Sequence, residues 1–200
     1  MSLRPPTSIP PLSAPLSDGT ITLRLGEERD IPEILVAHDN DSKLHANRGL
    51  RRPPSGAELG RSLEEAPSRR AAGTDEELTI VAGPTADGEF LGQVIIHSIE
   101  WEDRRAALGV WLTTAARGRG AGRRALQLTA QWLFDAWGME RIALHTAPDN
   151  TAMLACATAA GFEREGVLRD YHYNGRARED EVALALLSGA APEAPGAPSP

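Results

Sequence analysis

The sequence predicts a single α/β domain built on a mixed sheet. Two apolar strand segments, over 78–82 and 90–99, are joined by a turn-rich connection that is typical of an antiparallel pair. A buried strand over 105–112 leads through a glycine-rich turn into a helix, which is a crossover and not a hairpin. Asn174-Gly175 lies between two long strand segments and is suited to a type I′ turn, so a final hairpin is expected. Together these features exclude an all-parallel sheet.

Composition indicates a soluble globular protein. The chain has 200 residues, of which 41% are hydrophobic and 24% charged. A net charge of -7 disfavours general nucleic-acid binding, because phosphates require a basic surface. The single cysteine, Cys156, excludes an internal disulfide and a cysteine zinc cluster, and we expect no metal site. No segment approaches the roughly 18 apolar residues of a membrane span, and residues 1–18 lack the unbroken apolar segment that is typical of a secretory signal. A cytoplasmic protein is expected.

Proline-rich segments are predicted to flank the domain. Residues 1–18 contain five prolines and residues 189–200 contain four, without helical or strand periodicity. We expect two flexible tails around a folded domain over 19–188, with a proline-dependent docking ligand as the alternative for the first tail.

Periodicity and turn chemistry place the first elements. Residues 20–25 alternate between apolar and polar, which predicts a strand, and a helix over 27–38 has Glu28 and Asp30 in its acidic first turn. Ser55 and Glu58 have capping-box spacing and open a helix. The predicted order is strand 20–25, helix 27–38, a loop over 39–54 that carries candidate substrate contacts (His45, Asn47, Arg51, Arg52), helix 55–66 ending at Ala66-Pro67, and a surface loop over 67–77.

The second half is predicted in the same way. Apolar residues at helical spacing follow the glycine turn, with Trp132 and Trp137 in the core, and Gly138 ends that helix. Asn150 has helix-start chemistry, and Gly161 closes the next helix. The predicted order is strand 78–82, turn 83–89, strand 90–99, turn 100–104, strand 105–112, the long helix, strand 141–146, helix 150–161, and the hairpin of 162–173 and 176–187.

The turn Arg117-Gly-Arg-Gly-Ala-Gly122 is suited to a phosphate or pyrophosphate. Its three alternating glycines leave backbone N–H groups uncovered, and the following helix adds its own unpaired donors and the positive end of its dipole. A dinucleotide-binding turn needs a third glycine at position 123, where Arg123 stands, and the turn comes in the second half of the chain. No Gly-Lys-Ser/Thr follows, so a P-loop is excluded as well.

The turn resembles the pyrophosphate loop of the GNAT family of acyl-CoA-dependent N-acyltransferases, whose pattern is Arg/Gln-x-x-Gly-x-Gly/Ala. Asn150 opening a helix that closes at Gly161-Phe162 is similar to a second family signature. The chain looks most like the RimJ/RimL-like branch, and this resemblance covers about residues 20–187. It is carried further by Gly109-Val-Trp-Leu112, Glu165-Gly-Val-Leu-Arg169, Asn174-Gly-Arg176 and Asp180.

The resemblance implies a mostly antiparallel sheet with a splayed strand pair, helices on both faces, and acetyl-CoA between the splayed strands. Backbone groups of Trp111, Leu112 and Thr113 would hold the pantetheine, with an oxyanion donor near Leu112. The cofactor-binding set would be completed by the turn and the helix cap: Arg117, Gly118, Arg119, Gly120, Ala121, Gly122, Arg123 and Asn150. For Arg124, contact with a phosphate and a position on a solvated helix face are equally favoured interpretations.

The usual acid and base positions of the family carry apolar residues here, namely Ala107, Met153 and Ala157. Glu100 is the first substitute for the general base, beside Glu102 in the same turn. His172 and Tyr171 are further candidates, because the first strand of the last hairpin commonly borders the acceptor pocket in this family. His97 and His145 alternate with apolar neighbours and are interpreted as structural sheet residues, and Cys156 as a buried small hydrophobe.

The predicted function is acetyl transfer from acetyl-CoA to a primary amine by direct attack on the thioester. The acceptor would be a protein or peptide N-terminus, an amino acid, or a small amine such as an antibiotic, and the protein a monomer or a homodimer. The alternative is an acyl-CoA-binding or regulatory module that has lost turnover, since three acid/base positions are apolar. A nucleotide-dependent oxidoreductase is disfavoured by Arg123.

Overall fold

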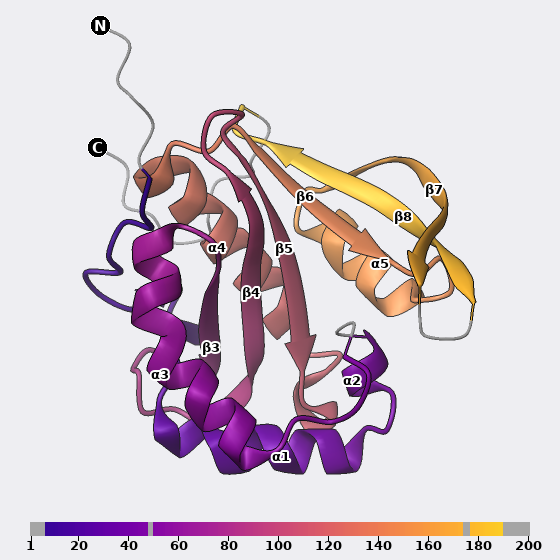
Figure 1. The fold of residues 1–200 in the computed structure, drawn as a ribbon. Helices are drawn as coiled ribbons and strands as arrows, with labels where there is room; N and C mark the ends of the chain where they lie inside the picture. Colours follow the sequence, from indigo (N-terminus) through magenta and orange to yellow (C-terminus); the bar gives the residue numbers. More distant parts are fainter. Residues whose placement is uncertain (1–6, 48–49, 174–176, 190–200) are drawn as a thin grey trace, which may run out of the picture.

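One eight-stranded sheet organises the protein. The computed structural model describes residues 7–47, 50–173 and 177–189, and its strand order is β1-β2-β3-β4-β5-β6-β8-β7 (Figure 1). The strands are β1 (Leu16–Ser17), β2 (Ile21–Leu25), β3 (Glu76–Ala82), β4 (Phe90–Glu100), β5 (Arg105–Leu112), β6 (Arg141–Thr146), β7 (Glu163–Tyr173) and β8 (Arg178–Leu187). The helices are η1 (Glu28–Asp30), α1 (Ile31–Asn40), α2 (Leu44–Asn47), α3 (Gly56–Ala72), η2 (Thr114–Ala116), α4 (Ala121–Trp137) and α5 (Thr151–Ala159).

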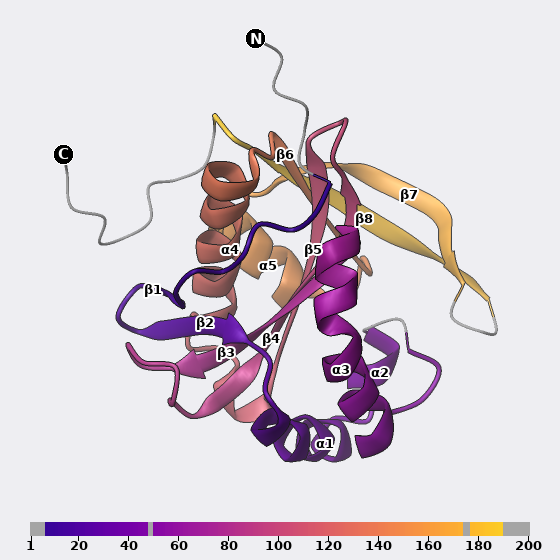
Figure 2. The ribbon, with the colours of Figure 1, turned by 60° about the vertical axis from the view of Figure 1, so that its left-hand side comes forward.

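Helices cover both faces of the sheet, as Figures 1 and 2 show. On one face, α4 and α5 pack on the main core, into which β5 points Ala106 and Leu108. On the other face, α1 and α3 lie over a smaller cluster that includes Trp111 of the same strand. Because side chains alternate along a strand, Ala107, Gly109 and Trp111 share this second face. The prediction that Trp132 and Trp137 are core residues is confirmed, and Trp137 stacks on Trp101 with ring centroids 5.5 Å apart.

β5 is paired differently on its two sides. It pairs antiparallel with β4 from Arg105 to Leu112, but parallel with β6 only from Arg105 to Ala107, opposite Arg141–Ala143. The remainder of β5 therefore has no partner strand on the β6 side. All other neighbouring strands are antiparallel. The predicted mostly antiparallel sheet with one splayed pair and helices on both faces is confirmed.

Residues 7–18 pack on the domain, and the prediction of a tail is wrong for them. Ile9 is only 4% exposed, and its N–H donates to the Arg70 carbonyl at 2.9 Å. Leu12 and Leu16 pack against the main core, and β1 extends the sheet beside β2 and α4 (Figure 2). Prolines interrupt any periodicity here, yet apolar side chains between them still gain from burial. Residues 1–6 and 190–200 lie outside the described residues.

The predicted end of α3 at Ala66-Pro67 is also wrong. Pro67 lies inside the helix, which continues to Ala72, and β3 starts at Glu76, so most of the predicted surface loop over 67–77 is regular structure. Arg70 forms an ion pair with Glu76, and Gly73 closes the helix in the left-handed region at φ 70°. These contacts to the following strand compensate for the hydrogen bond that proline removes. Within the predicted loop over 39–54 the chain forms α2, and the Asn174-Gly175 turn lies outside the described residues.

Candidate active site

The glycine turn places uncovered N–H groups at the start of α4. Gly118 and Gly120 adopt φ 73° and 82°, the left-handed conformation that glycine reaches without strain. Gly120 is the N-cap and supplies no side chain, and the first helical hydrogen bond runs from the Arg124 N–H to the Gly120 carbonyl. The N–H groups of Ala121, Gly122 and Arg123 therefore precede the helical ladder. With the positive end of the helix dipole, they form a site suited to an anion.

Arg117 connects two elements beside this turn. Its guanidinium donates to Asp41 at 2.5 Å and to the Leu112 carbonyl at 3.0 Å. The hydrogen bond from Arg117 lowers the pKa of Asp41, against the opposing effect of burial. Since Asp41 follows α1, Arg117 braces α1 against the end of β5. Its charge is thus already compensated, which weakens its predicted role toward a phosphate.

The other arginines of the turn fall into two groups. Arg124 donates to Asp18 at 2.5 Å and so joins α4 to the N-terminal segment. Burial raises the pKa of Asp18, but hydrogen bonds from Ile21, Arg124 and Thr20 outweigh it and lower the pKa. Arg119 and Arg123 are exposed and form no ion pair within the described part of the chain. These two arginines are therefore the cations that the turn offers to a phosphate.

Gly122 allows close packing beneath the turn. A Cβ at this position would lie 3.1 Å from Cys156 Sγ and 3.6 Å from Leu112 Cδ1. The third glycine therefore avoids a tight contact where α4 passes α5 and β5. Burial raises the pKa of the Cys156 thiol, so Cys156 stays protonated near neutral pH, consistent with a small packing residue.

We expect Gly122→Val to destabilise the protein by about 1–3 kcal/mol, because the added methyl groups overpack the contact with Cys156. Urea unfolding measures the change. In a Cys156→Ala background, where the sulfur is absent, the same substitution should cost less by about 1 kcal/mol or more. An equal cost in both backgrounds would show that Cys156 does not limit the space at Gly122.

Asn150 holds the start of α5 at the same edge of the sheet. Its Oδ1 accepts from the Met153 N–H at 3.2 Å, and its Nδ2 donates to Thr146 Oγ1 at 3.1 Å. The predicted cap is confirmed, whereas contact with a cofactor stays a prediction. Because β5 and β6 run parallel, α4 and α5 begin at neighbouring points, one after each strand (Figure 1).

The ladder pattern identifies the backbone groups that face the split between β5 and β6. The Thr113 N–H donates to the Leu91 carbonyl at 2.8 Å, so residue 113 points its N–H toward β4. Alternation along an antiparallel ladder then directs the N–H and C=O groups of Leu108, Val110 and Leu112 toward β6. The predicted oxyanion donor, the Leu112 N–H, fits this geometry. Val110, which the sequence analysis did not name, also directs its backbone groups toward the split, whereas those of Trp111 and Thr113 point toward β4 and away from it.

The side chain of Trp111 does not belong to the split. It is buried against Phe90, with ring centroids 5.8 Å apart, and lies 6.2 Å from the His38 ring on α1. Its role is to anchor α1 on β5.

Glu100 lies at the wrong end of β5 for the general base. It pairs with Arg105, whose guanidinium donates to it at 2.6 Å. Arg105 is seven residues before Leu112, which corresponds to about 23 Å along a strand. Glu100 is also beyond the closed end of the split, which lies at Ala107. The prediction of Glu100 as base is therefore wrong on geometric grounds, and Glu102 follows it in the same exposed turn.

The other two candidates lie on β7 but differ in their neighbours. The Tyr171 ring meets the His145 ring edge-on, with centroids 5.4 Å apart. His145 Nδ1 in turn lies 3.6 Å from Glu181 Oε2 on β8. His172 stands opposite Glu179 in the β7–β8 ladder. The structure thus brings Tyr171, but not His172, to a cluster on β6.

His97 stands directly across from Ala107, the position at which the family's glutamate is absent. A β-bulge follows, since His97 pairs with Ala107 but Glu100 pairs with Arg105, and Ser98 adopts φ 50°. Desolvation lowers the pKa of His97, and the charge of His145 lowers it further, against an opposing effect of Asp75. His97 and His145 were expected to be structural, but both are exposed on the face that carries Ala107.

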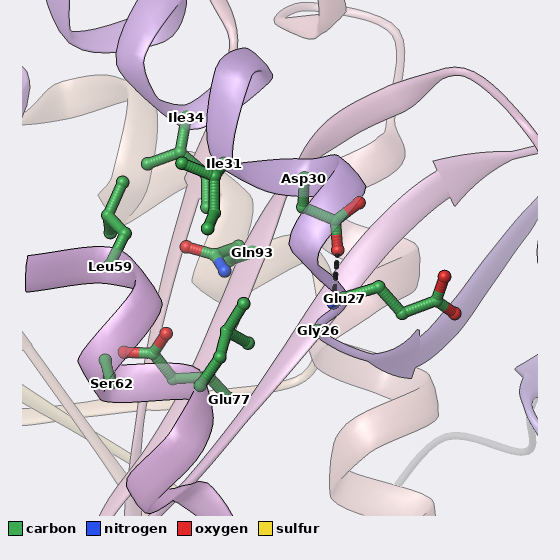
Figure 3. A pocket seen from close by; sticks show the side chains of 10 residues that line it. Gly26, Glu27, Asp30, Ile31, Ile34, Leu59, Ser62, Glu77 and Gln93 are labelled. Carbon is green, nitrogen blue, oxygen red and sulfur yellow. Dashed lines mark hydrogen bonds between the residues drawn. The ribbon is translucent and has the colours of Figure 1, made fainter. Parts of the chain in front are cut away.

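Two hollows lie outside the split. A cavity of about 30 Å³ between η1, α1, α3 and the sheet is lined by Asp30, Ile34, Leu59 and Gln93 and has room for water only (Figure 3). An open groove of about 900 Å³ runs below α1 beside residues 113–115. Its arginines, Arg24 and Arg29, are paired with carboxylates, so this groove does not offer an anion site.

A sheet split beside a glycine-rich helix start, followed by a capped helix after the next strand, defines the acyltransferase class. Residues 20–163 match the family model described as "Acetyltransferase (GNAT) domain". The chain belongs to the GNAT acetyltransferase family.

Relatives and solved structures agree with this assignment. The Bacillus subtilis (strain 168) protein named "Putative ribosomal N-acetyltransferase YdaF" is 28% identical over 170 residues, which are 84% of this chain and 91% of that protein. A structure of Mycobacterium smegmatis RimJ in complex with CoA-disulfide superposes with a TM-score of 0.72 at 23% identity, covering 88% of this chain and 87% of that one. A structure of Vibrio cholerae spermidine N-acetyltransferase in complex with CoA and spermine superposes with a TM-score of 0.73 at 19% identity, covering 86% of this chain and 98% of that one.

Two kinds of feature are absent from the residues that the structure describes. Over 7–47, 50–173 and 177–189, no group of three or more His, Cys, Asp or Glu side chains is arranged to hold a metal ion. Over the same residues, none of the helices combines the length and the apolar character needed to cross a membrane.

Proposed function

We propose that this protein transfers an acetyl group from acetyl-CoA to a primary amine by direct attack of the amine on the thioester. The single observation that carries the proposal is the split between β5 and β6, which opens at the glycine turn. A split of this kind offers unpaired backbone groups to an extended arm, and the helix start offers donors to a pyrophosphate.

The residues present fit acetyl-CoA. The N–H groups at 121–123 and the exposed arginines Arg119 and Arg123 would meet the pyrophosphate. The backbone groups of Val110 and the N–H of Leu112 would meet the pantetheine arm and the thioester carbonyl, and an N–H there would stabilise the oxyanion. The split is about 13 Å long from Leu108 to Leu112, at about 3.3 Å per residue. The RimJ and spermidine N-acetyltransferase structures were both solved with CoA or a CoA adduct, which supports this choice of donor.

The acceptor is proposed to be a cationic primary amine. It would approach from the face that carries Ala107, because α4, α5 and the main core fill the other face. Glu181 Oε2 lies 3.6 Å from His145 Nδ1 on the approach face, and carboxylates attract an ammonium group. The names of relatives mention ribosomal proteins and spermidine, which supports a peptide N-terminus or a polyamine-like molecule.

An acyl-CoA-binding module without turnover is the second candidate. It is favoured by Ala107, Met153 and Ala157, which leave the family's usual acid and base positions without a titratable group.

An amine panel separates the two. The purified protein is incubated with acetyl-CoA and either spermidine, an amino acid or a short peptide with a free N-terminus, and release of the CoA thiol is followed. Acceptor-dependent release, with acetylated product found by mass spectrometry, is the expected result. Calorimetric binding of acetyl-CoA without release on any acceptor would favour the module, and absence of binding would reject both.

A further inference from the structure

His97 and His145 lie on the same face of the sheet, on either side of β5 near the closed end of the split. Register places His97 of β4 opposite Ala107 of β5, and Ala107 opposite Ala143 of β6. His145 follows Ala143 by two residues and so points to the same face of the sheet. Two strand spacings, about 10 Å, separate β4 from β6. The two imidazoles therefore stand on either side of β5, with His97 level with Ala107 and His145 level with Gly109, two residues further along the strand. Neither Ala107 nor Gly109 places a long side chain between them.

We propose that His97 is the general base that takes the proton from the acceptor ammonium, in the place of the carboxylate that Ala107 lacks. This proposal rests on the proposed function of acetyl transfer. His145 stands on the far side of the acceptor and acts as a positioning residue.

The depth of the split supports this placement. A pyrophosphate at 121–123 would put the acyl end of the donor deep in the split, at the backbone groups of Val110 and Leu112. Val110 is three residues from Ala107, or about 10 Å along the strand. The acceptor amine, together with at most one water molecule, fills that distance, and general bases act directly or through one water.

The β-bulge at Ser98 independently supports His97 as the general base. Two residues of β4, Ser98 and Ile99, oppose the single residue Ala106 of β5. Without the extra residue, His97 would pair with Leu108 and point into the core below α4, because a one-residue slip moves a side chain to the other face. Ser98 adopts φ 50°, a conformation that costs free energy for any residue except glycine. Bulges next to active sites commonly redirect a side chain in this way.

The surrounding charges keep His97 ready to accept a proton. Desolvation lowers its pKa, the cation at His145 lowers it further, and Asp75 opposes both. His145 itself faces Glu181 at 3.6 Å, the ring of Tyr171, and the charge of Glu165. Ser98 Oγ lies 3.0 Å from His97 Nδ1, which leaves Nε2 for the acceptor. The lowered pKa keeps the His97 imidazole unprotonated at neutral pH and able to accept a proton.

The step balances without an added reagent. One proton moves from the ammonium to His97, and the freed nitrogen lone pair forms the C–N bond at the thioester carbon. The C–S bond then breaks with its electron pair on sulfur, and the second proton lost by the nitrogen neutralises the CoA thiolate. His97 releases its proton to water, so the net products are the amide, the CoA thiol and one proton.

A measurement without turnover tests the electrostatic part. Imidazole signals of the full chain are followed by NMR between pH 4.5 and 8.5 and assigned with the His97→Gln and His145→Gln variants. His97 is expected to titrate below the usual value of about 6.5, and its pKa should rise in His145→Gln, because a neighbouring positive charge is removed. If the pKa of His97 is the same in His145→Gln as in the wild type, the proposed interaction between the two histidines is wrong.

Kinetics test the base itself, with spermidine and a short peptide as acceptors. Wild-type kcat/KM should fall on the acidic side with the pKa of His97. In His97→Gln, kcat should fall about 100-fold, the acidic limb should disappear, and the Kd for acetyl-CoA should stay within about twofold. The same substitution at His172 should keep the acidic limb.

The outcomes are separable. A His97→Gln variant with wild-type kcat and an intact acidic limb would overturn the assignment of His97, as would loss of that limb in His172→Gln. If the wild-type protein binds acetyl-CoA but acetylates no amine, the proposed function is wrong, and the assignment of His97 as a base is wrong with it. The NMR titration would still report whether His97 and His145 interact.

Discussion

Gly120→Asp is expected to weaken acetyl-CoA binding about 100-fold, as measured by calorimetry. Gly120 is the N-cap of α4, directly before the N–H groups that would hold the pyrophosphate. A carboxylate there would repel the phosphates by a few kcal/mol at short range, and 100-fold corresponds to about 2.8 kcal/mol. A Cβ at Gly120 meets no heavy atom within 4 Å, so packing would not change.

Gly120→Asn is the matched control. Asparagine has nearly the same shape and tolerates the left-handed conformation at φ 82° about as well as aspartate, but it carries no charge. We expect its Kd to stay within about tenfold of the wild-type value. Equal losses in the two variants would mean that backbone strain, not charge, explains the effect, and undiminished binding by Gly120→Asp would reject the turn as the pyrophosphate site.

Arg24→Met is expected to destabilise the fold by about 3–5 kcal/mol in urea unfolding. Arg24 and Asp30 are 5% and 2% exposed and form a bidentate ion pair at 2.8 and 2.7 Å. Asp30 also accepts from the Glu27 N–H and from Thr79 Oγ1. Removal of the guanidinium leaves a buried carboxylate without its counter-charge, and this costs more than the ion pair contributes by itself.

The pH dependence of the same pair has a defined sign. Burial raises the pKa of Asp30, but the hydrogen bonds from Arg24, Glu27 and Thr79 outweigh it, so the folded-state pKa is lowered. The stabilisation is therefore present above the unfolded value of about 3.9 and is lost as the pH falls through the folded-state pKa. In Arg24→Met, protonation of Asp30 relieves the buried charge, so the difference between the two proteins should narrow in acid.

Arg29→Met is the control for this prediction. Arg29 pairs with Asp87 and Glu27 nearby, but its side chain is 47% exposed. Exposed ion pairs contribute about 0–1 kcal/mol, so the variant should stay within about 1 kcal/mol of the wild type. A loss from Arg29→Met as large as that from Arg24→Met would contradict the importance of burial.

Local patterns predicted most of the fold because the elements carry their own signals. The glycine turn, the apolar stripe of α4 and its end at Gly138 are visible in the sequence, and the structure has them at the expected positions. Features stabilised from a distance were missed. α3 continues past Pro67 because Arg70 reaches Glu76 of the next element, and Ile9 is buried by residues that come much later in the chain.

The candidate site also has one part that the sequence predicts and one part that it does not. The phosphate-binding turn is one contiguous segment, so its spacing was sufficient for a prediction. The proposed base, His97, depends on the register between β4 and β5, and one bulge residue at Ser98 changes the partner of Ala107 from Ser98 to His97. No propensity reveals such an insertion, since Ser98 is an ordinary strand residue by composition. In the sequence, Glu100 is a carboxylate in the turn before β5, and only the pairing with Arg105 reveals its distance from the split.

A crystal structure of the protein with acetyl-CoA is the most direct test of the account. We predict the pyrophosphate within hydrogen-bond distance of the N–H groups at 121–123, and the thioester between β5 and β6 at Val110 or Leu112. Acetyl-CoA bound in the groove below α1, or lying outside the split between β5 and β6, would contradict the assignment of the site.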